Sequence, residues 1–139
     1  LAQHLGGKIY SSPDKSSEIG FFNILPKNGG KEIFKKQTIF FQWHNEGFTL
    51  PNSCEILASG DKFDNQAFRY KNAYGLQFHP EVNFYLHLRW LFFICLYSPY
   101  KLKVKGAQSI YNQLLLRIKY NKDLNNWLEY FLDNYLLKL

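Results

Sequence analysis

The chain has 139 residues, enough for one domain, and its 46% hydrophobic residues, with 19% aromatics, supply a buried core, which excludes an intrinsically disordered protein. Seventeen Lys and Arg residues against eleven Asp and Glu residues give a net charge of +6, but the basic residues are scattered and cluster only at Lys35 and Lys36 and at Lys101, Lys103 and Lys105. Neither cluster has the arginines and interleaved aromatics of a nucleic-acid groove, so we expect no nucleic-acid partner.

The first part of the chain has the composition of short strands joined by turns, with β-branched and aromatic residues interrupted by Gly, Pro, Asn and Asp. Residues 1–5 precede Gly6 and Gly7 and predict the last turns of a helix, since glycine readily takes the left-handed conformation found just past helix ends. A loop is predicted at residues 11–17 and a turn at residues 26–30. The strands are predicted at residues 8–10, 18–25, 38–43, 55–58, 67–70 and 74–78.

From residue 83 onward, apolar residues recur at helical spacing, which predicts helices at residues 83–97, 107–119 and 123–137, the last capped by Asp123. The expected core-facing residues are Leu86, Trp90 and Phe93 in the first helix, Ile110, Leu114 and Ile118 in the second, and Leu124, Trp127, Leu128, Phe131 and Leu132 in the third. A mixed sheet followed by helices predicts one α/β domain, with no linker to divide it.

The two cysteines, Cys54 and Cys95, are far apart and lack the C-x-x-C spacing of a zinc site, so we expect no metal site and no disulfide framework. The most apolar run, residues 92–97, is too short to span a bilayer, and residues 1–5 lack the basic-then-apolar order of a signal peptide. These observations predict a cytoplasmic protein with no membrane partner and no cofactor.

A candidate catalytic pair follows the last predicted strand. Pro80 biases His79 toward an extended backbone, and side chains two residues apart in an extended chain point to the same side, so His79 and Glu81 can touch. A carboxylate on one imidazole nitrogen fixes the tautomer and raises the basicity of the other nitrogen, as a general base beside a nucleophile requires. Alone, such a pair is more often a surface ion pair than a catalytic one.

The surrounding sequence changes that balance, because seven segments resemble, in the same order, segments of the class I (triad) glutamine amidotransferases, most closely their GMP-synthase-like branch. The resemblance is dense over residues 1–82 and thins beyond them, although residues 106–109 and 127–136 are also similar to the family's tail. The seven segments are residues 2–7 (AQHLGG), 18–22 (EIGFF), 41–44 (FQWH), 48–51 (FTLP), 57–59 (LAS), 65–69 (NQAFR) and 75–82 (GLQFHPEV).

The resemblance implies the C-terminal part of a flavodoxin-like three-layer α/β fold and hydrolysis of the glutamine side-chain amide to glutamate and ammonia by a cysteine thiolate. His79 would be the base that activates the thiol and the acid that protonates ammonia, and Glu81 would orient it. Trp43, His44 and Asn45, at a strand end in the polar segment 44–47, would line the glutamine pocket chiefly through main-chain groups. A synthetase domain or chain would accept the ammonia. For His44, capping of the neighbouring backbone is an equally good interpretation.

The nucleophile itself is not in the chain. In the family, the helix ending in Ala-x-x-Leu-Gly-Gly starts at a Gly-x-Cys-x-Gly elbow, which counts back to roughly six residues before Leu1. Cys54 has no such elbow around it, and Cys95 lies in an apolar helix where burial would make a thiol inert, so both are interpreted as structural. We therefore expect residues 1–139 to be a partial amidotransferase domain that is inactive alone.

Three interpretations remain open at this stage. The chain is part of a glutaminase, a catalytically inactive interaction module that keeps the fold, or a related hydrolase of γ-glutamyl or other amide bonds. The segments that the family places before residue 1 would supply central strands, so we also expect an open sheet edge and an exposed apolar face, and through them self-association or pairing with another chain. Residues 45 and 46 are Asn-Glu where relatives commonly have Gly-Asp, which leaves the fine structure of the substrate loop open.

Overall fold

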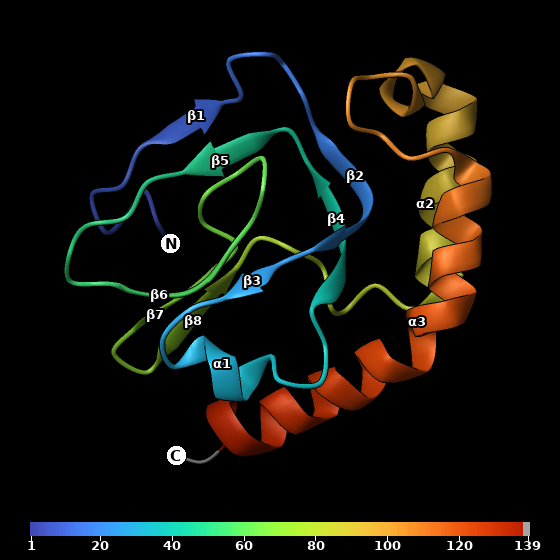
Figure 1. Cartoon of the computed structure of the whole chain (residues 1–139). Helices are drawn as coiled ribbons and strands as arrows, with labels where there is room; N and C mark the ends of the chain where they lie inside the picture. Colours follow the sequence, from blue (N-terminus) through green and yellow to red (C-terminus); the bar gives the residue numbers. More distant parts are fainter. Residues whose placement is uncertain (138–139) are drawn as a thin grey trace.

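The computed structural model describes residues 1–137, in which eight short strands are followed by two long helices (Figure 1). The strands are β1 (Ile9–Ser11), β2 (Glu18–Asn23), β3 (Leu25–Pro26), β4 (Ile39–His44), β5 (Glu46–Phe48), β6 (Glu55–Ser59), β7 (Ala67–Tyr70) and β8 (Ala73–Leu76). The helices are α1 (Gly30–Ile33), α2 (Phe84–Tyr97), the 3-10 helix η1 (Pro99–Leu102), α3 (Ile110–Phe131) and the π-helix η2 (Leu132–Leu136).

The strands form three small antiparallel sheets. β1 pairs with β5, β2 pairs with β4, and the third sheet has the order β3-β6-β7-β8. β2 and β4 pair along their whole length, from Glu18 opposite His44 to Asn23 opposite Ile39. This α/β arrangement of antiparallel sheets and helices agrees with the predicted fold class.

The outer edge of β2 is covered by the segment before α3. Ile19 and Ala107 form a parallel bridge, and the Gln108 side chain bonds both main-chain groups of Phe21, accepting from the N–H at 2.9 Å and donating to the carbonyl at 2.6 Å. Gly20, with φ +127°, makes this contact possible, because a Cβ there would collide with the Gln108 side chain. The amide of Gln108 thus takes the place of a neighbouring strand. Whether another open edge supports self-association stays a prediction.

All six predicted strands are present, but three predictions at or near them are wrong. The strand predicted at residues 18–25 divides at Ile24, whose N–H donates to the Thr38 carbonyl, and the chain then enters a different sheet as β3. Pro26 belongs to β3, where an edge strand tolerates its missing N–H, rather than to a turn. The segment predicted as the polar loop 44–47 is a single bend at Asn45 between β4 and β5.

The predicted helices at residues 107–119 and 123–137 are the two limbs of one helix, α3, extended by η2. No Pro or Gly separates them, so helical hydrogen bonding continues through Asp123, which is an exposed mid-helix residue and not a cap. Ser109 caps α3 instead, its hydroxyl accepting from the Asn112 N–H. In Figure 1 the first limb lies along α2, and the second passes beneath α1 and the sheets.

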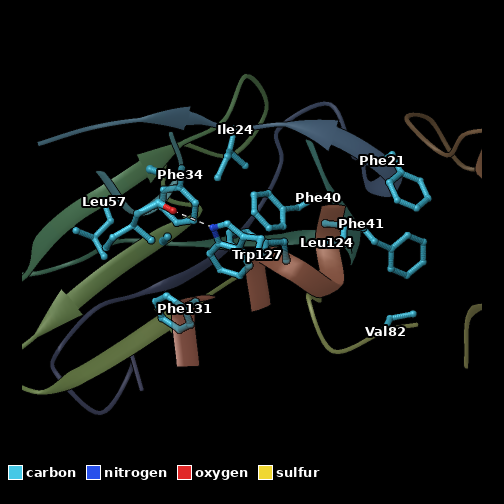
Figure 2. Packing of buried hydrophobic residues seen from close by; sticks show 14 residues of the cluster. Phe21, Ile24, Phe34, Phe40, Phe41, Leu57, Val82, Leu124, Trp127 and Phe131 are labelled. Carbon is cyan, nitrogen blue, oxygen red and sulfur yellow. Dashed lines mark hydrogen bonds between the residues drawn. The ribbon is translucent and has the colours of Figure 1, made fainter. Parts of the chain in front are cut away.

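The second limb of α3 closes the main hydrophobic core (Figure 2). Trp127 stacks between Phe34 and Phe131, meets Phe40 edge-on at 4.7 Å between ring centroids, and donates from its indole nitrogen to the Ile33 carbonyl at 2.9 Å. The predicted core face of this limb is confirmed, because Leu124, Trp127 and Phe131 are all buried. Burying an aromatic ring of this size accounts for a few kcal/mol of stability, so this limb anchors the fold.

The predicted face of the first limb of α3 is wrong, and that of α2 is only partly right, because Leu86 and Trp90 are half-buried and pack against the core. α2 buries His87, Leu91 and Ile94, one position round from the expected face, and Phe93 is exposed. The first limb of α3 buries Gln113 and Arg117, whereas Ile110 and Ile118 are exposed. On the first limb of α3 a count of apolar spacing could not find the inward face, because Gln113 and Arg117 are polar. On α2 the inward face includes the polar His87 beside the apolar Leu91 and Ile94.

These inward polar residues form one connected chain. Arg117 donates from Nε to Nδ1 of His87 at 3.3 Å, Nε2 of His87 lies 3.2 Å from the Gln113 side-chain oxygen, and Gln113 donates to the Gln108 carbonyl. The guanidinium lies over the rings of Phe21 and Phe41, 4.9 and 5.1 Å from their centroids, and its two terminal nitrogens have no hydrogen-bond partner within residues 1–137. Cation–π contact is therefore its main compensation for burial, and burial lowers the Arg117 pKa to about 10.

The same burial acts on His87. Burial, and then the nearby Arg117 charge, lower the His87 pKa from 6.5 to about 4, while the bond to Gln113 opposes the shift. His87 must be neutral to accept from Arg117, so its Nδ1 carries the lone pair and its Nε2–H donates to Gln113.

No helix among residues 1–137 is long and apolar enough to cross a membrane.

The lowered His87 pKa predicts acid sensitivity. Below pH 6.5 the unfolded chain binds a proton that the folded chain does not take up until about pH 4, so this contribution to stability is complete above pH 6.5 and is lost as the pH falls. We expect His87 alone to cost about 2 kcal/mol of unfolding free energy between pH 7.5 and pH 5. Urea unfolding at the two pH values measures it.

The matched control is His87→Gln, which keeps an acceptor for Arg117 and removes the titrating group. Its unfolding free energy should fall less over the same interval, and the difference between the two proteins isolates His87 from the other histidines. Equal losses in both proteins would contradict the assignment.

Candidate functional site

The candidate site is built where the chain leaves β8 and turns into α2. Phe78 is buried and stacks on Phe40 of β4, with 4.1 Å between ring centroids. The next residue, His79, donates its main-chain N–H to the Phe41 carbonyl at 2.8 Å. Gly75 lets β8 reach this position, because a Cβ there would collide with the Phe68 ring of β7. The backbone of His79 is thus fixed against β4 by its neighbour in sequence.

The His79 ring is held by Glu81, as the sequence predicts for an extended His-Pro-Glu segment. Nδ1 of His79 lies 2.8 Å from Oε1 of Glu81, and the two side chains are 31% and 58% exposed. A carboxylate can only accept, so Nδ1 carries the proton. Nε2 makes no hydrogen bond within residues 1–137 and bears the lone pair of the partly exposed ring. This is the arrangement of a base whose reactive nitrogen is free for a ligand or a nucleophile.

Trp90 is a third support for His79 that the sequence did not identify. Its ring meets the His79 ring edge-to-face, with 5.4 Å between centroids and an angle of 80°, and it packs in the same manner on Trp43 at 5.7 Å. The sequence predicts Trp90 as an ordinary core residue of the helix. The one local signal was that α2 begins three residues after Glu81, capped by the Asn83 side chain, so its second turn lies near the pair.

Of the predicted pocket residues, Trp43 lies on the same side of β4 as His79, because Trp90 packs against both of them. His44, the next residue along the strand, points to the opposite face. Asn45 is exposed at the bend between β4 and β5. The structure therefore brings His79, Glu81 and Trp43 together and separates the His44 side chain from them.

The His44 side chain is engaged in a buried polar network. Its Nδ1 lies 3.0 Å from the Glu46 carbonyl, and its Nε2 is 3.1 Å from both the Gln42 side-chain oxygen and the Glu18 carboxylate. All three partners present acceptor oxygens to the ring. These contacts favour the capping interpretation for the His44 side chain, and a ligand role for its main chain stays a prediction.

The network continues away from His44 without a gap. Glu18, only 2% exposed, accepts from the Gln66 side-chain nitrogen at 2.8 Å, and Gln66 in turn accepts from the Gln42 side chain at 2.8 Å. A carboxylate buried to this degree is stable only when its oxygens are paired in this way. The network ties β2 and β4 to the segment before β7 and fixes the strand end at which Trp43 lies.

A shallow groove of about 280 Å³ opens beside the His79–Trp90 contact. It is lined by Trp43 of β4, by Trp90, Phe93, Ile94 and Tyr97 of α2, and by Ser98 and Lys101, which follow α2. A second hollow, of about 350 Å³, lies between α1 and α3 and contains none of the predicted site residues. The groove is therefore the hollow that the geometry connects with the His79–Glu81 pair.

The two cysteines differ from each other more than the sequence suggests. Cys54 is half-buried and packs against the small cluster of Ala2, Phe48 and Phe68. Cys95 is exposed on α2, so the expectation that it is buried is wrong, because α2 turns only one narrow face inward. Neither has a glycine elbow or the start of a helix beside it. Within residues 1–137 no group of three or more His, Cys, Asp or Glu side chains is placed to hold a metal ion.

The chain is similar to two curated archaeal proteins, although no family model matches it. Both are named as one of the subunits of a glutamine-hydrolyzing GMP synthase. The chain is 38% identical over 90 residues to the protein from Methanosphaera stadtmanae, an alignment that covers 59% of this chain and 48% of that protein. It is 31% identical over 86 residues to the protein of the same name from Methanobrevibacter smithii, with 60% and 45% covered. The chain thus spans about half the length of the curated relatives it matches.

Solved structures agree over almost the whole chain. A glutamine amidotransferase from Thermotoga maritima superposes with a TM-score of 0.83 at 27% identity, covering 99% of this chain and 58% of that one. A glutamine amido transferase from Methylobacillus flagellatus gives the same TM-score at 23% identity, covering 98% and 57%, and supports the fold alone.

The Glu81 contact predicts the tautomer of His79. In the neutral protein we expect the proton on Nδ1, and Glu81→Gln, which can no longer accept as a carboxylate, should shift the population toward the Nε2–H form. Nitrogen-15 NMR of the imidazole ring distinguishes the two tautomers. Glu46→Gln, at an exposed carboxylate that is not bonded to His79, is the control; an unchanged His79 spectrum in Glu81→Gln would contradict the pairing.

The exposures of the thiols predict their reactivity. Cys95 should react with a disulfide reagent much faster than half-buried Cys54, and Cys95→Ser should leave a single slow phase. Stopped-flow or manual mixing with Ellman's reagent measures both rates. Two equally slow thiols in the folded protein would show that α2 is covered in solution.

Proposed function

Because the chain belongs to the class I glutamine amidotransferase family, in its GMP-synthase-like branch, we propose that it supplies the base and the orienting carboxylate of a glutaminase. The observation that carries the proposal is the His79–Glu81 contact of 2.8 Å, which leaves Nε2 of a half-exposed imidazole free. Glutamine hydrolysis needs this arrangement, because one group must first remove a proton from a thiol and then return it to ammonia.

In the proposed reaction, Nε2 of His79 takes the proton of a cysteine thiol, and the thiolate attacks the carboxamide carbon of glutamine. The tetrahedral oxyanion collapses as the carbon–nitrogen bond breaks, and the imidazolium gives its proton to the departing nitrogen, which leaves as ammonia. Water then attacks the thioester, with His79 again accepting a proton, and glutamate and the free thiol are formed. Glu81 holds the ring and stabilises the imidazolium at each stage.

The proposed nucleophile comes from outside residues 1–139, as do the oxyanion donors that the family takes from its elbow and from a glycine-rich loop. Cys54 packs into a small apolar cluster and Cys95 lies on the solvent face of α2, so neither is assigned this role. Loss of one oxyanion donor typically slows acyl transfer by about 100- to 1000-fold, so the chain alone should be inactive even if a thiol were offered.

Glutamine would bind near the end of β4. Trp43 forms one wall of the groove beside His79, and the main-chain groups of Trp43, His44 and Asn45 are proposed to hold the substrate. The His44 side chain supports this strand end through Glu18 and Gln42 rather than by touching the ligand. The ammonia acceptor is proposed to be a synthetase, since the names of the curated relatives make each of them one subunit of a GMP synthase.

A second candidate function is a non-catalytic interaction module. The exposed apolar residues of α2 favour it, because such a surface is typical of a protein that binds another. A hydrolase of γ-glutamyl or other amide bonds would use the same pair, and a panel of glutamine, γ-glutamyl peptides and asparagine would separate it from a glutaminase.

The central prediction concerns His79. In a form of the protein that carries the proposed cysteine, His79→Ala should reduce release of ammonia and glutamate from glutamine by at least about 100-fold, since it removes the general base and acid. Glu81→Gln should reduce it less, because the base remains but is less well oriented. Coupled assays of both products measure the rates.

His4→Ala is the matched control, because His4 is exposed in the N-terminal turn and makes none of the contacts of the site. Its rate should equal that of the unsubstituted protein. Unchanged turnover in His79→Ala would refute the assigned role, and no turnover in any form would favour the interaction module.

A further inference from the structure

Glu81 alone is a weak restraint on the His79 ring. The carboxylate is 58% exposed and the imidazole 31%, and an ion pair that is open to solvent contributes little net energy. A glutamate side chain has several rotatable bonds, so an exposed carboxylate can follow the imidazole as it turns. The contact of 2.8 Å between Nδ1 and Oε1 therefore selects the tautomer without fixing the direction in which Nε2 points.

The main chain of His79 is held more firmly than its ring. Its N–H donates to the Phe41 carbonyl at 2.8 Å, and the preceding residue, Phe78, is buried in the core. These contacts place the backbone and leave the side-chain torsions of His79 to be set by other neighbours. A general base must keep its reactive nitrogen within hydrogen-bond reach of the group it serves, so the ring needs a further restraint.

Trp90 supplies this restraint. Its ring meets the His79 imidazole edge-to-face, with 5.4 Å between centroids and an angle of 80°, which is a favoured geometry for aromatic pairs. Trp90 is half-buried and is held by other rings, because it packs on Trp43 at 5.7 Å and on Phe41 at 6.2 Å. Phe41 is also the residue whose carbonyl accepts from the His79 N–H. The backbone and the ring of His79 are thus referred to the same strand, β4.

We propose that Trp90 is a positioning residue for the glutaminase reaction, one that holds the His79 imidazole in a single orientation and joins it to Trp43. The inference rests on the proposed function. Trp43 and the main chain around it are proposed to hold glutamine, so one indole contacts both the base and the wall of the substrate pocket. The position of the base relative to the substrate then depends on two direct ring contacts.

The surroundings of Trp90 differ from those of an ordinary core tryptophan. Trp127 of α3 is 4% exposed, stacks among apolar rings and donates to the Ile33 carbonyl. Trp90 is only half-buried, and two of its three ring partners within residues 1–137, His79 and Trp43, belong to the candidate site. Replacing Trp90 should therefore affect the site more than it affects the core.

The kinetic test uses the full-length protein that carries the proposed cysteine. Trp90→Leu keeps an apolar helix former and removes the ring, so kcat for glutamine hydrolysis should fall by about 10- to 100-fold, because a small displacement of the base is costly. KM should stay within about threefold, since main-chain groups are proposed to hold the substrate. Trp90→Phe keeps an aromatic ring beside His79 and should recover most of the rate. Coupled assays of ammonia and glutamate give both constants.

A second measurement does not depend on turnover. The His79 ring lies beside an indole whose ring current shifts its proton resonances, so Trp90→Leu should move the His79 ring signals in NMR spectra. The signals of His4, which is exposed in the N-terminal turn, should stay in place. Phe92→Leu is the matched control variant. Phe92 is exposed on the same helix and its ring meets that of Phe93, so its replacement should change neither the rate nor the His79 signals.

Each variant is first checked for an unchanged urea midpoint. Three results would overturn the inference. The first is normal turnover in Trp90→Leu while His79→Ala is inactive, which would leave the proposed function standing. The second is a loss that Trp90→Phe does not restore and that follows a lowered urea midpoint, as for an ordinary core residue. The third is a raised KM at unchanged kcat, which would confine the effect to Trp43.

The proposed function can fail separately from the role of Trp90. Absence of turnover in every form of the protein, combined with moved His79 signals in Trp90→Leu and unmoved signals in Phe92→Leu, would sink the glutaminase proposal. Trp90 would then still be the residue that orients the His79 ring.

Discussion

The stacked rings of Phe40 and Phe78 hold together the two segments from which the site is made. Phe40 belongs to β4 and Phe78 lies two residues after the end of β8, directly before His79; both are buried and pack against Trp127. Because neighbouring residues in an extended chain face opposite sides, sinking Phe78 into the core turns His79 toward β4 and α2, where Phe41, Glu81 and Trp90 meet it. The geometry of the His79–Glu81 pair is thus a consequence of hydrophobic packing one residue away.

Polar groups are buried on both faces of the β2–β4 pair. Their hydrogen bonds fix the position of the strands and helices, in addition to filling the core. On one face Glu18, Gln66, Gln42 and His44 satisfy one another, and on the other face His87 links Gln113 to Arg117. Such networks contribute less net stability than apolar packing, because each buried group must first lose its water. They do specify one arrangement of the strands and helices, since a shifted register would leave charges without partners.

The sequence was a good guide wherever apolar side chains decide the structure. It located the strands, the Leu124–Trp127–Phe131 face and the His79–Glu81 contact, which depends only on an extended backbone held by Pro80. It failed where polar residues turn inward, as at Arg117 and His87, because spacing rules count only apolar residues. It also missed Trp90, since a contact between residues on two different elements has no local pattern. The split of residues 18–25 between two sheets was equally invisible, because both halves are good strands.

Gln108 shows how the fold prevents the edge of β2 from pairing with another chain. A sheet ends safely only if the last strand cannot recruit another chain, and proteins commonly use charges, prolines or bulges for this purpose. Here one side-chain amide occupies the donor and the acceptor of Phe21, so an incoming strand meets no free hydrogen-bonding groups at that point. Gln108 therefore blocks the addition of a strand to this edge. Without it, the free edge of β2 could pair with another chain and promote aggregation, while the His79–Glu81 contact on a different part of the fold stayed in place.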